Sequence, residues 1–130
     1  MSEQQIRERF EAFAAAWNAH DVAAMAECFV ARGNITHPWG DFAAGRDEIT
    51  ALLEREHRAA MRESRCRFDH LALRQLSDTS AVVEAQGVLE RVLAPNGSVY
   101  ELPHRINAVV VEEDGWRFLS MNPTPDRAGR

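Results

Sequence analysis

The sequence contains little cysteine and no long apolar run. Its two cysteines, Cys28 and Cys66, form no C-x-x-C motif, and no histidines show HxxxH or HxH spacing, so we expect buried free thiols and no metal site. No apolar run reaches the roughly 18 residues of a membrane-spanning helix. The N-terminal stretch is charged and unlike a signal peptide, so we expect a cytoplasmic protein with no membrane partner.

Positive charge is also in deficit. Lys and Arg number 15 against 20 Asp and Glu, which gives a formal net charge of −5 at pH 7. The basic residues are scattered rather than gathered in a stripe, so nucleic acid is not an expected partner. The most arginine-rich stretch, Arg55 to Arg67, is interrupted by Glu56 and Glu63, which is typical of a solvated helix face. A Gly-rich nucleotide loop is absent, so no dinucleotide cofactor is expected.

Apolar residues recur with a helical period in the first half of the chain. A length of 130 residues with 45% hydrophobic residues suits one globular domain over 1–130. Three helices are predicted: one with Ile6, Phe10, Phe13 and Trp17 on its buried face, one capped by Asp21 that includes Phe29 and ends near Gly33, and one from Gly45 to about Arg62.

The second half changes to the alternating period of β-strands. Strands are predicted from Cys66 onward with a bulge near Leu71, from Ala81 to Leu93, from Val99 to Glu112 and from Trp116 to Asn122, with hairpin turns between them. Residues 123–130 are expected to form a mobile tail. Helices followed by antiparallel strands indicate an α+β fold, in which a strongly curved sheet wraps around the three helices and leaves a blind pocket.

Hairpin pairing predicts which side chains share one face of the sheet. A hairpin turn with Asn96-Gly97 would pair Gln86 with Arg105 and Glu84 with Asn107, and a last turn at Glu113 and Asp114 would pair Val111 with Trp116. One end of a face would then hold Trp116, Phe118, Val109 and Val111, and the other end Glu84, Gln86, Arg105, Asn107, Ser120 and Asn122. An apolar end grading into a polar cluster is typical of a small-molecule pocket. A bulge at Pro103 would instead turn Arg105 and Asn107 to the other face, as a solvated or dimer-facing patch, and both interpretations remain open.

His37 is the best single candidate for chemistry. It precedes Pro38 between the second and third helices, and imidazole can take up a proton near neutral pH. Trp39 points the same way on an extended chain and could stack on a flat substrate. His57 falls on the inner stripe of the third helix and either faces the pocket or is a core histidine. His37 as a hydrogen-bonded wall residue and Trp39 as a core residue are the alternatives.

Three stretches of the sequence resemble a known superfamily. "AAWNAHDVAAMAECF", "ITHPWGDFAAGRDEI" and "DGWRFLSMN" are similar to the nuclear transport factor 2-like superfamily, the cone-shaped α+β fold of SnoaL-like polyketide cyclases, ketosteroid isomerases and limonene epoxide hydrolases. The resemblance covers roughly residues 5 to 123. Within the superfamily, the chain is most similar to the SgcJ/EcaC-type group, in Trp39-Gly40, Gly45-Arg46, His57, Arg105, Trp116 and Asn122. The resemblance also implies a homodimer formed through the open sheet face.

The resemblance to ketosteroid isomerases bears on mechanism. Their proton-shuttling base is the Asp of an Asp-Pro-x-Gly motif, and this sequence has His37 there. The Tyr that serves them as oxyanion donor corresponds to Phe13, which has no donor, so oxyanion stabilisation would need Arg105, Asn107 or Asn122.

Two hypotheses follow. In the first, the protein is a cofactor-independent isomerase, cyclase or dehydratase acting on an apolar, oxygenated metabolite. His37 is then the general acid/base, Arg105, Asn107 and Asn122 orient an oxygen, and the apolar walls are Phe13, Trp17, Trp39, Trp116 and Phe118. In the second, the same fold only binds a ligand or dimerises.

Overall fold

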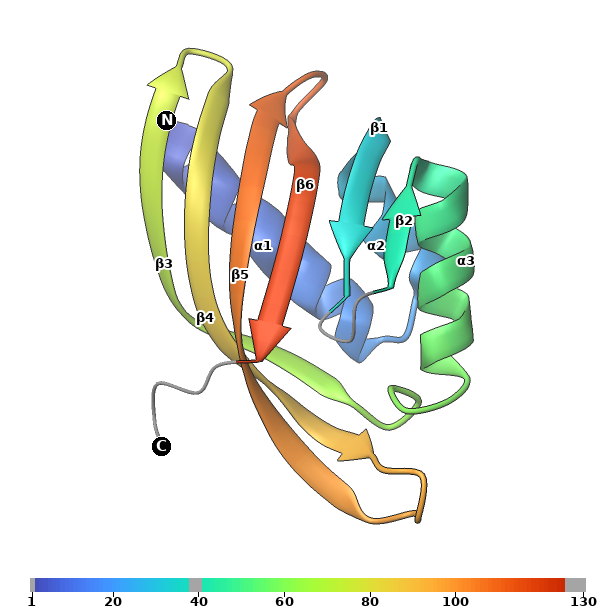
Figure 1. Cartoon of the computed structure of the whole chain (residues 1–130). Coiled ribbons are helices and arrows are strands. Elements are labelled where there is room, and N and C mark those ends of the chain that lie inside the picture. The colour runs from blue at the N-terminus through green and yellow to red at the C-terminus, as the bar shows by residue number, and fades with distance from the viewer. Residues whose placement is uncertain (1, 38–40, 126–130) are drawn as a thin grey trace.

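Within residues 2–37 and 41–125, which the computed structural model describes, the chain forms three helices and six strands (Figure 1). Residues 1, 38–40 and 126–130 lie outside this description, and Trp39 is among them. In chain order, the elements are α1 (Ser2–Asn18), α2 (Val22–Glu27), β1 (Phe29–Thr36), β2 (Phe42–Ala44), α3 (Arg46–His57), β3 (Arg65–Ser77), β4 (Ser80–Leu93), β5 (Val99–Glu112) and β6 (Trp116–Pro125).

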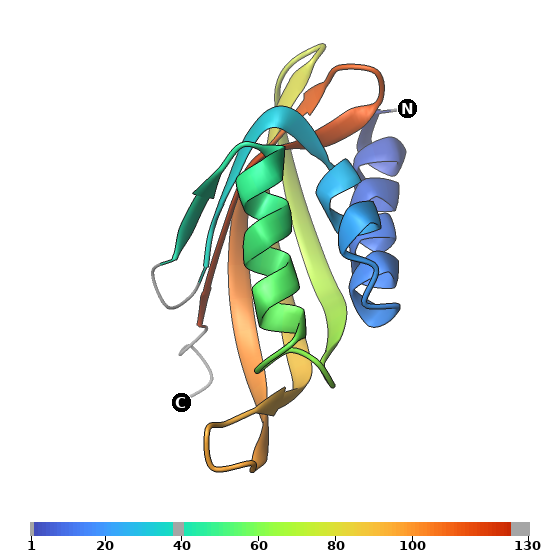
Figure 2. The same cartoon turned by 90° about the vertical axis from the view of Figure 1, so that its right-hand side faces the viewer.

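The strands form one six-stranded sheet in the order β2-β1-β6-β5-β4-β3. Only the contact between β1 and β6 is parallel among these neighbours. The sheet is strongly bent, and the helices lie together on one of its faces, with α2 between α1 and α3 (Figures 1 and 2). The predicted α+β fold with a curved, mainly antiparallel sheet around three helices is confirmed.

Aromatic rings fill the space between α1 and the sheet. Phe10, Phe13 and Trp17 of α1 are buried, as their helical spacing predicts. The Phe10 ring stands edge-on to Phe118 with centroids 5.0 Å apart, and Phe13 meets Phe118 at 5.8 Å and Phe29 at 6.2 Å. This packing joins α1, β1 and β6 in one core.

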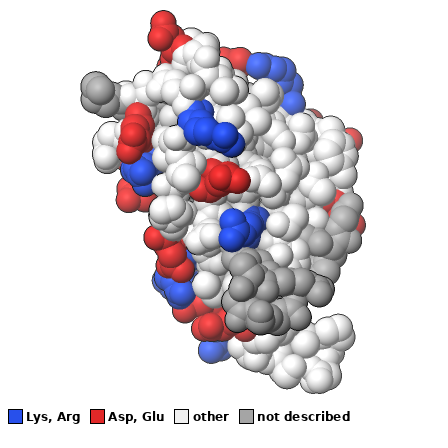
Figure 3. Space-filling model, turned by 60° about the vertical axis from the view of Figure 1, so that its left-hand side comes forward, with Lys and Arg blue, Asp and Glu red and all other residues white. Residues whose placement is uncertain are grey.

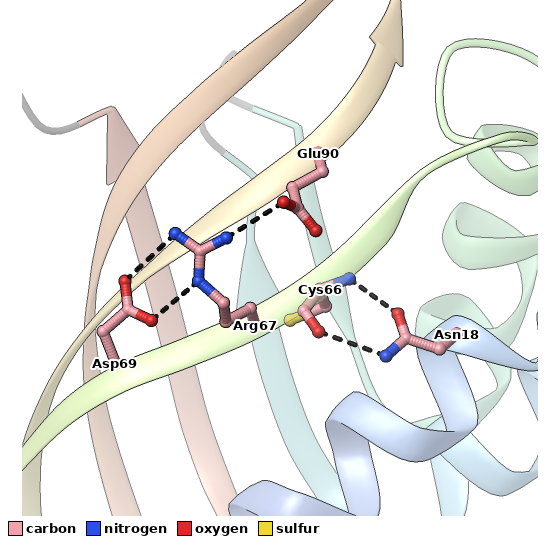
Figure 4. Close-up of polar contacts among 5 residues, drawn as sticks. All are labelled: Asn18, Cys66, Arg67, Asp69 and Glu90. Atoms are coloured by element: carbon pink, nitrogen blue, oxygen red, sulfur yellow. Dashed lines mark hydrogen bonds and ion pairs between the residues drawn. The ribbon is translucent and has the colours of Figure 1, made fainter.

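The end of α1 is fastened to β3 by a side-chain amide. Asn18 Oδ1 accepts a hydrogen bond from the Cys66 backbone N–H at 2.7 Å, and Asn18 Nδ2 donates to the Cys66 carbonyl at 3.2 Å (Figure 4). On the same strand, Arg67 reaches Asp69 and Glu90 in exposed ion pairs. Because Trp17 directly precedes Asn18, the two hydrogen bonds of the Asn18 amide fix the position of the Trp17 indole along β3.

The second helix is shorter than predicted. Asp21 does cap it, since its Oδ1 accepts from the Ala24 N–H at 3.1 Å, but the helix ends at Glu27 and Phe29 already belongs to β1. Phe29 also fits the spacing of a helix, but pairing with β6 makes it part of a strand. The Phe118 N–H donates to the Cys28 carbonyl at 2.8 Å. Gly33 lies inside β1, where a Cβ would come within 3.1 Å of the Phe118 carbonyl oxygen.

Two other boundaries differ from the sequence prediction. α3 ends at His57 rather than near Arg62, and turns follow it. β6 continues to Pro125, so residues 123–125 belong to a strand instead of the predicted tail. The bulge predicted near Leu71 occurs as a register shift between Phe68 and His70.

The last hairpin is offset from its predicted register. Trp116 pairs with Glu112 rather than Val111, because the turn contains three residues, with Asp114 at φ 59° and Gly115 at φ 99°. A second shift follows where β6 passes Leu119, so that Phe118 pairs with Val110 but Ser120 pairs with Val109. The strand therefore turns Trp116 and Phe118 inward and Ser120 and Asn122 toward the opposite face.

The β4–β5 pairing agrees with the prediction. Glu84 lies opposite Asn107, and Gln86 lies opposite Arg105. Their chain neighbours Ala85, Ile106 and Ala108 are buried against the helices, so these four polar side chains lie on the outer face of the sheet. On the face of the molecule seen in Figure 3, acidic and basic side chains are interspersed on a largely uncharged surface.

Candidate active site

A buried histidine and a glutamate meet where β1 ends. His37 directly follows β1, and its backbone N–H donates to the Asp41 carbonyl at 2.6 Å. Its Nε2 atom lies 2.6 Å from Oε1 of Glu56, with side chains 3% and 12% exposed. At this distance, a protonated imidazole forms a buried ion pair with the carboxylate, which fixes the orientation of the ring.

The helix α3 directs Glu56 inward by its spacing. Ile49, Leu52 and Leu53 are buried, and Glu56 follows them three and four residues after Leu53 and Leu52 on the same stripe. The prediction that Glu56 belongs to a solvated helix face is therefore wrong. The signal was present in the sequence, because a carboxylate continued a buried apolar stripe.

His37 of this pair lines a small cavity between α1 and the concave face of the sheet, and Glu56 does not. The cavity measures about 30 Å³, roughly the room of one or two water molecules. His37 and His104 are its two imidazoles. The other lining residues are apolar side chains and one thiol: Phe13, Trp17, Ile35, Cys66, Phe68, Leu89, Ile106, Met121 and Pro123. The structure thus places two imidazoles on the wall of a small, largely apolar cavity.

Hydrogen bonds hold the indole wall of the cavity in place. Trp17 Nε1 donates to Ser64 Oγ at 2.8 Å, and Ser64 Oγ donates to the Met61 carbonyl at 2.8 Å. Both partners are buried, so the ring is fixed by fully desolvated contacts. Burial also raises the pKa of the Cys66 thiol to about 12, which keeps this lining group protonated and unreactive.

His57 lies beside the cavity rather than on its wall. Its ring packs edge-on against Trp17 with centroids 4.4 Å apart, and its Nδ1 lies 2.9 Å from Nδ1 of His20. Desolvation, followed by the charges of His20 and His37, lowers the pKa of His57 to about 4. His57 is therefore a neutral imidazole at pH 7. It faces another imidazole, an arrangement that neither sequence interpretation included.

We expect the pH dependence of stability to report His57. Its pKa of about 4 in the folded state lies below the ordinary value of 6.5, so between these values the unfolded chain binds the proton more readily. The free energy of unfolding should therefore fall as the pH drops below about 6.5 and level off near 4. Because the ring is partly exposed, the loss from pH 7 to 5 should be only about 1 kcal/mol.

The substitution His57→Phe should remove most of this pH-dependent loss of stability. Urea denaturation of the wild type and of His57→Phe at pH 7 and pH 5 measures the free energy of unfolding. An identical drop in the wild type and in His57→Phe would contradict the lowered pKa.

The remaining predicted site residues separate into three groups. Phe13, Trp17 and His37 surround the cavity. Trp116 and Phe118 are buried, but neither lines this cavity. Glu84, Gln86, Arg105, Asn107 and Asn122 lie on the outer face of the sheet, so the predicted pocket shared by His37 and Arg105 does not form. The two shifts in the last hairpin explain the error, because they turn Trp116 and Phe118 away from the polar cluster.

Two residues of the outer polar cluster, Ser120 and Asn122, are hydrogen-bonded to their neighbours. Ser120 Oγ donates to Asn34 Oδ1 at 3.1 Å, and Asn122 Nδ2 donates to Ser120 Oγ at 3.0 Å and to the Asn107 carbonyl at 3.3 Å. Ser120 and Asn122 are thus joined to Asn34 and to the backbone of Asn107 on the face away from the helices.

Comparison with known proteins places this geometry in a family. The model of the SnoaL-like domain matches residues 10–118. The chain belongs to the SnoaL-like domain family. No curated protein matches this SnoaL-like domain in sequence.

Solved structures support the same fold for this SnoaL-like domain. A protein from Caulobacter vibrioides with a cystatin-like fold is 21% identical with a TM-score of 0.87, over 98% of this chain and 92% of that chain. A candidate scytalone dehydratase from Novosphingobium aromaticivorans is 18% identical with a TM-score of 0.85, over 95% and 83%. ActVI-ORFA from Streptomyces coelicolor is 26% identical with a TM-score of 0.80, over 97% and 98%. The predicted superfamily is confirmed.

Two features are absent from the residues that the structure describes. No helix among them is long and apolar enough to cross a membrane. In the same part of this SnoaL-like domain, no three His, Cys, Asp or Glu side chains are arranged to hold a metal ion.

Proposed function

We propose that the protein is a small-molecule enzyme in which His37, oriented by Glu56, transfers protons on an apolar, oxygenated ring compound. The observation that carries the proposal is the contact of 2.6 Å between His37 Nε2 and Glu56 Oε1 beside an apolar cavity. Isomerisation, cyclisation and dehydration all fit, because each requires removal and return of a proton and none requires a cofactor.

The proposed mechanism is a proton transfer by His37 that Glu56 supports. His37 accepts a proton from a carbon next to a substrate carbonyl and becomes an imidazolium, which the Glu56 carboxylate stabilises. The same proton then returns to another carbon, or to a departing hydroxyl group. Both side chains are largely buried, so the electrostatic stabilisation by Glu56 is stronger than it would be at the surface.

The size of the cavity sets a condition on binding. A cavity of about 150 Å³ holds a benzene ring, whereas this one measures about 30 Å³. The apolar lining must therefore separate when a ring compound binds. The neighbour described as a candidate scytalone dehydratase supports dehydration as one reaction to test.

The alternative is a module that binds a ligand without converting it. Phe13 favours this alternative, because it lines the cavity and offers no hydrogen-bond donor to a substrate oxygen. Arg105 and Asn107, on the outer sheet face, do not serve the cavity as oxyanion donors in this conformation. Pairing of two copies through that outer face stays a prediction.

A ligand screen tests the proposal and separates the two functions. Hydroxylated naphthalenes, anthraquinones and small terpenoids would be added to the purified protein, and the shift of the thermal midpoint measured. Each stabilising compound would then be incubated with the protein and followed by chromatography. We expect at least one stabilising compound to be consumed, and stabilisation without consumption in every case would favour the binding module.

A further inference from the structure

Two histidines, the exposed His20 and the half-buried His57, contact each other near the ends of α1 and α3. His20 Nδ1 and His57 Nδ1 are 2.9 Å apart, with ring centroids separated by 5.1 Å. At that distance one Nδ1 carries a proton and the other accepts it, so the two rings share a single proton. The contact connects the end of α1 to the last residue of α3.

The outer member of this pair is held open to water. His20 is exposed and borders a surface hollow that His57 also lines, together with Asp21, Val22, Ala23, Glu54 and Arg58. Its backbone has φ 55°, the left-handed region that histidine enters more readily than most residues. This conformation, just after α1 ends, places the His20 ring against His57.

The inner member points its second nitrogen into the protein. Nε2 of His57 is buried, and it has no hydrogen-bond partner among the residues that the structure describes. A buried polar atom without a partner costs about 1–3 kcal/mol, so its retention needs an explanation. Leu or Phe would fill the same space without that cost.

Two contacts connect His57 to the candidate active site. It directly follows Glu56, whose carboxylate meets His37, and it packs against Trp17, which lines the cavity with His37. The charge of His37 is also among the causes that lower the pKa of His57, so the two rings are within electrostatic reach. The buried side of His57 therefore lies near the proton-transfer pair.

We propose that His20 and His57 form a proton relay between bulk water and the buried His37–Glu56 pair. His20 takes a proton from water on Nε2 and donates the proton already on its Nδ1 to Nδ1 of His57, while His57 releases the proton on Nε2 toward the pair, directly or over one water molecule. One proton enters and one leaves, so both rings stay neutral and change only their tautomers. The reverse passage restores the starting tautomer and carries a proton out.

The neighbouring charges are compatible with this passage. The titratable and charged groups around the two rings are Asp21 and Glu54 with Arg58 in the surface hollow, and Glu56 with His37 on the inner side. The low pKa of His57 disfavours a charged intermediate, so acceptance at one nitrogen and release from the other occur together. Any contribution of the relay to catalytic turnover rests on the proposed function, whereas the passage of protons through His20 and His57 does not.

The relay is tested by exchange of the His37 ring protons with water, which requires no substrate. Nitrogen-15 NMR measures that rate in the wild type, in His20→Asn and in His57→Phe. Asn tolerates the left-handed backbone of His20, and Phe keeps a ring against Trp17. We expect the exchange to slow by at least about tenfold in both variants, because the proton path is interrupted.

A merely structural role predicts the opposite sign, since loosened packing would let water reach His37 and speed up the exchange. His70→Phe, at an exposed histidine of β3, is the matched control and should leave the rate unchanged. An unchanged or faster rate in either His20→Asn or His57→Phe would overturn the relay. That outcome would leave the chemistry proposed for His37 standing, and loss of ligand conversion would leave the relay standing.

Discussion

Replacing His37 with Gln is expected to lower the turnover of any converted ligand by about 10²–10⁴-fold, the usual contribution of a general acid or base. Gln is similar in size to histidine, and its amide N–H can still face Glu56, so the buried carboxylate keeps a polar neighbour. The amide cannot accept and return a proton at neutral pH. Binding should persist, because the cavity is lined largely by apolar side chains.

The comparison requires both rate and affinity. Steady-state kinetics gives kcat, and the thermal-shift titration used in the ligand screen gives binding, for the wild type, His37→Gln and the control His70→Gln. His70 is an exposed histidine on β3, so its replacement should change neither quantity. Undiminished kcat in His37→Gln, with the control also unchanged, would exclude His37 as the proton carrier.

Phe118→Ala is expected to lower the free energy of unfolding by about 3–5 kcal/mol. The ring is fully buried and meets Phe10, Phe13 and Phe29 at centroid distances of 5.0, 5.8 and 5.3 Å. Removing it leaves a cavity at the place where α1, β1 and β6 join. Had Phe118 lined an open pocket, as the expected hairpin register implied, the loss would be much smaller.

Urea denaturation measures the effect, with Phe42→Ala as the matched control. The Phe42 side chain is 62% exposed, so its removal should change the free energy of unfolding by less than about 0.5 kcal/mol. Similar losses in the two variants would contradict the packing described for Phe118.

Local patterns were sufficient to predict most of the fold. The spacing of Phe10, Phe13 and Trp17 specified the buried face of α1, and the Asn96-Gly97 turn specified the β4–β5 hairpin, with Glu84 opposite Asn107 as observed. These features depend on residues close in sequence or on one tight turn. The buried face of α1 and the β4–β5 hairpin could therefore be predicted without knowing the rest of the chain.

The errors arose where distant strands decide the local structure. Phe29 continues a helical spacing but joins β1, because β6 supplies hydrogen-bond partners for that segment. In the last hairpin, a turn longer by one residue and the shift at Leu119 reversed which side chains share a face with Arg105. A period of two residues cannot reveal such a shift, since each bulge exchanges the two faces.

The candidate site was only half predictable for the same reason. His37 was identified from its own chemistry and its place before Pro38. Its partner Glu56 lies on another element, and His104 enters the cavity from β5. Glu56 could have been found from the buried stripe of α3. The His20–His57 contact could not, because it depends on how the ends of α1 and α3 approach each other.

A crystal structure of the protein with a consumed compound from the screen, bound to the slow variant His37→Gln, is the most direct measurement of where chemistry occurs. We expect electron density between Phe13, Trp17 and the substituted side chain, with a ligand carbon or oxygen at proton-transfer distance from position 37. Density on the outer sheet face beside Arg105 and Asn107, with the cavity still closed, would contradict it.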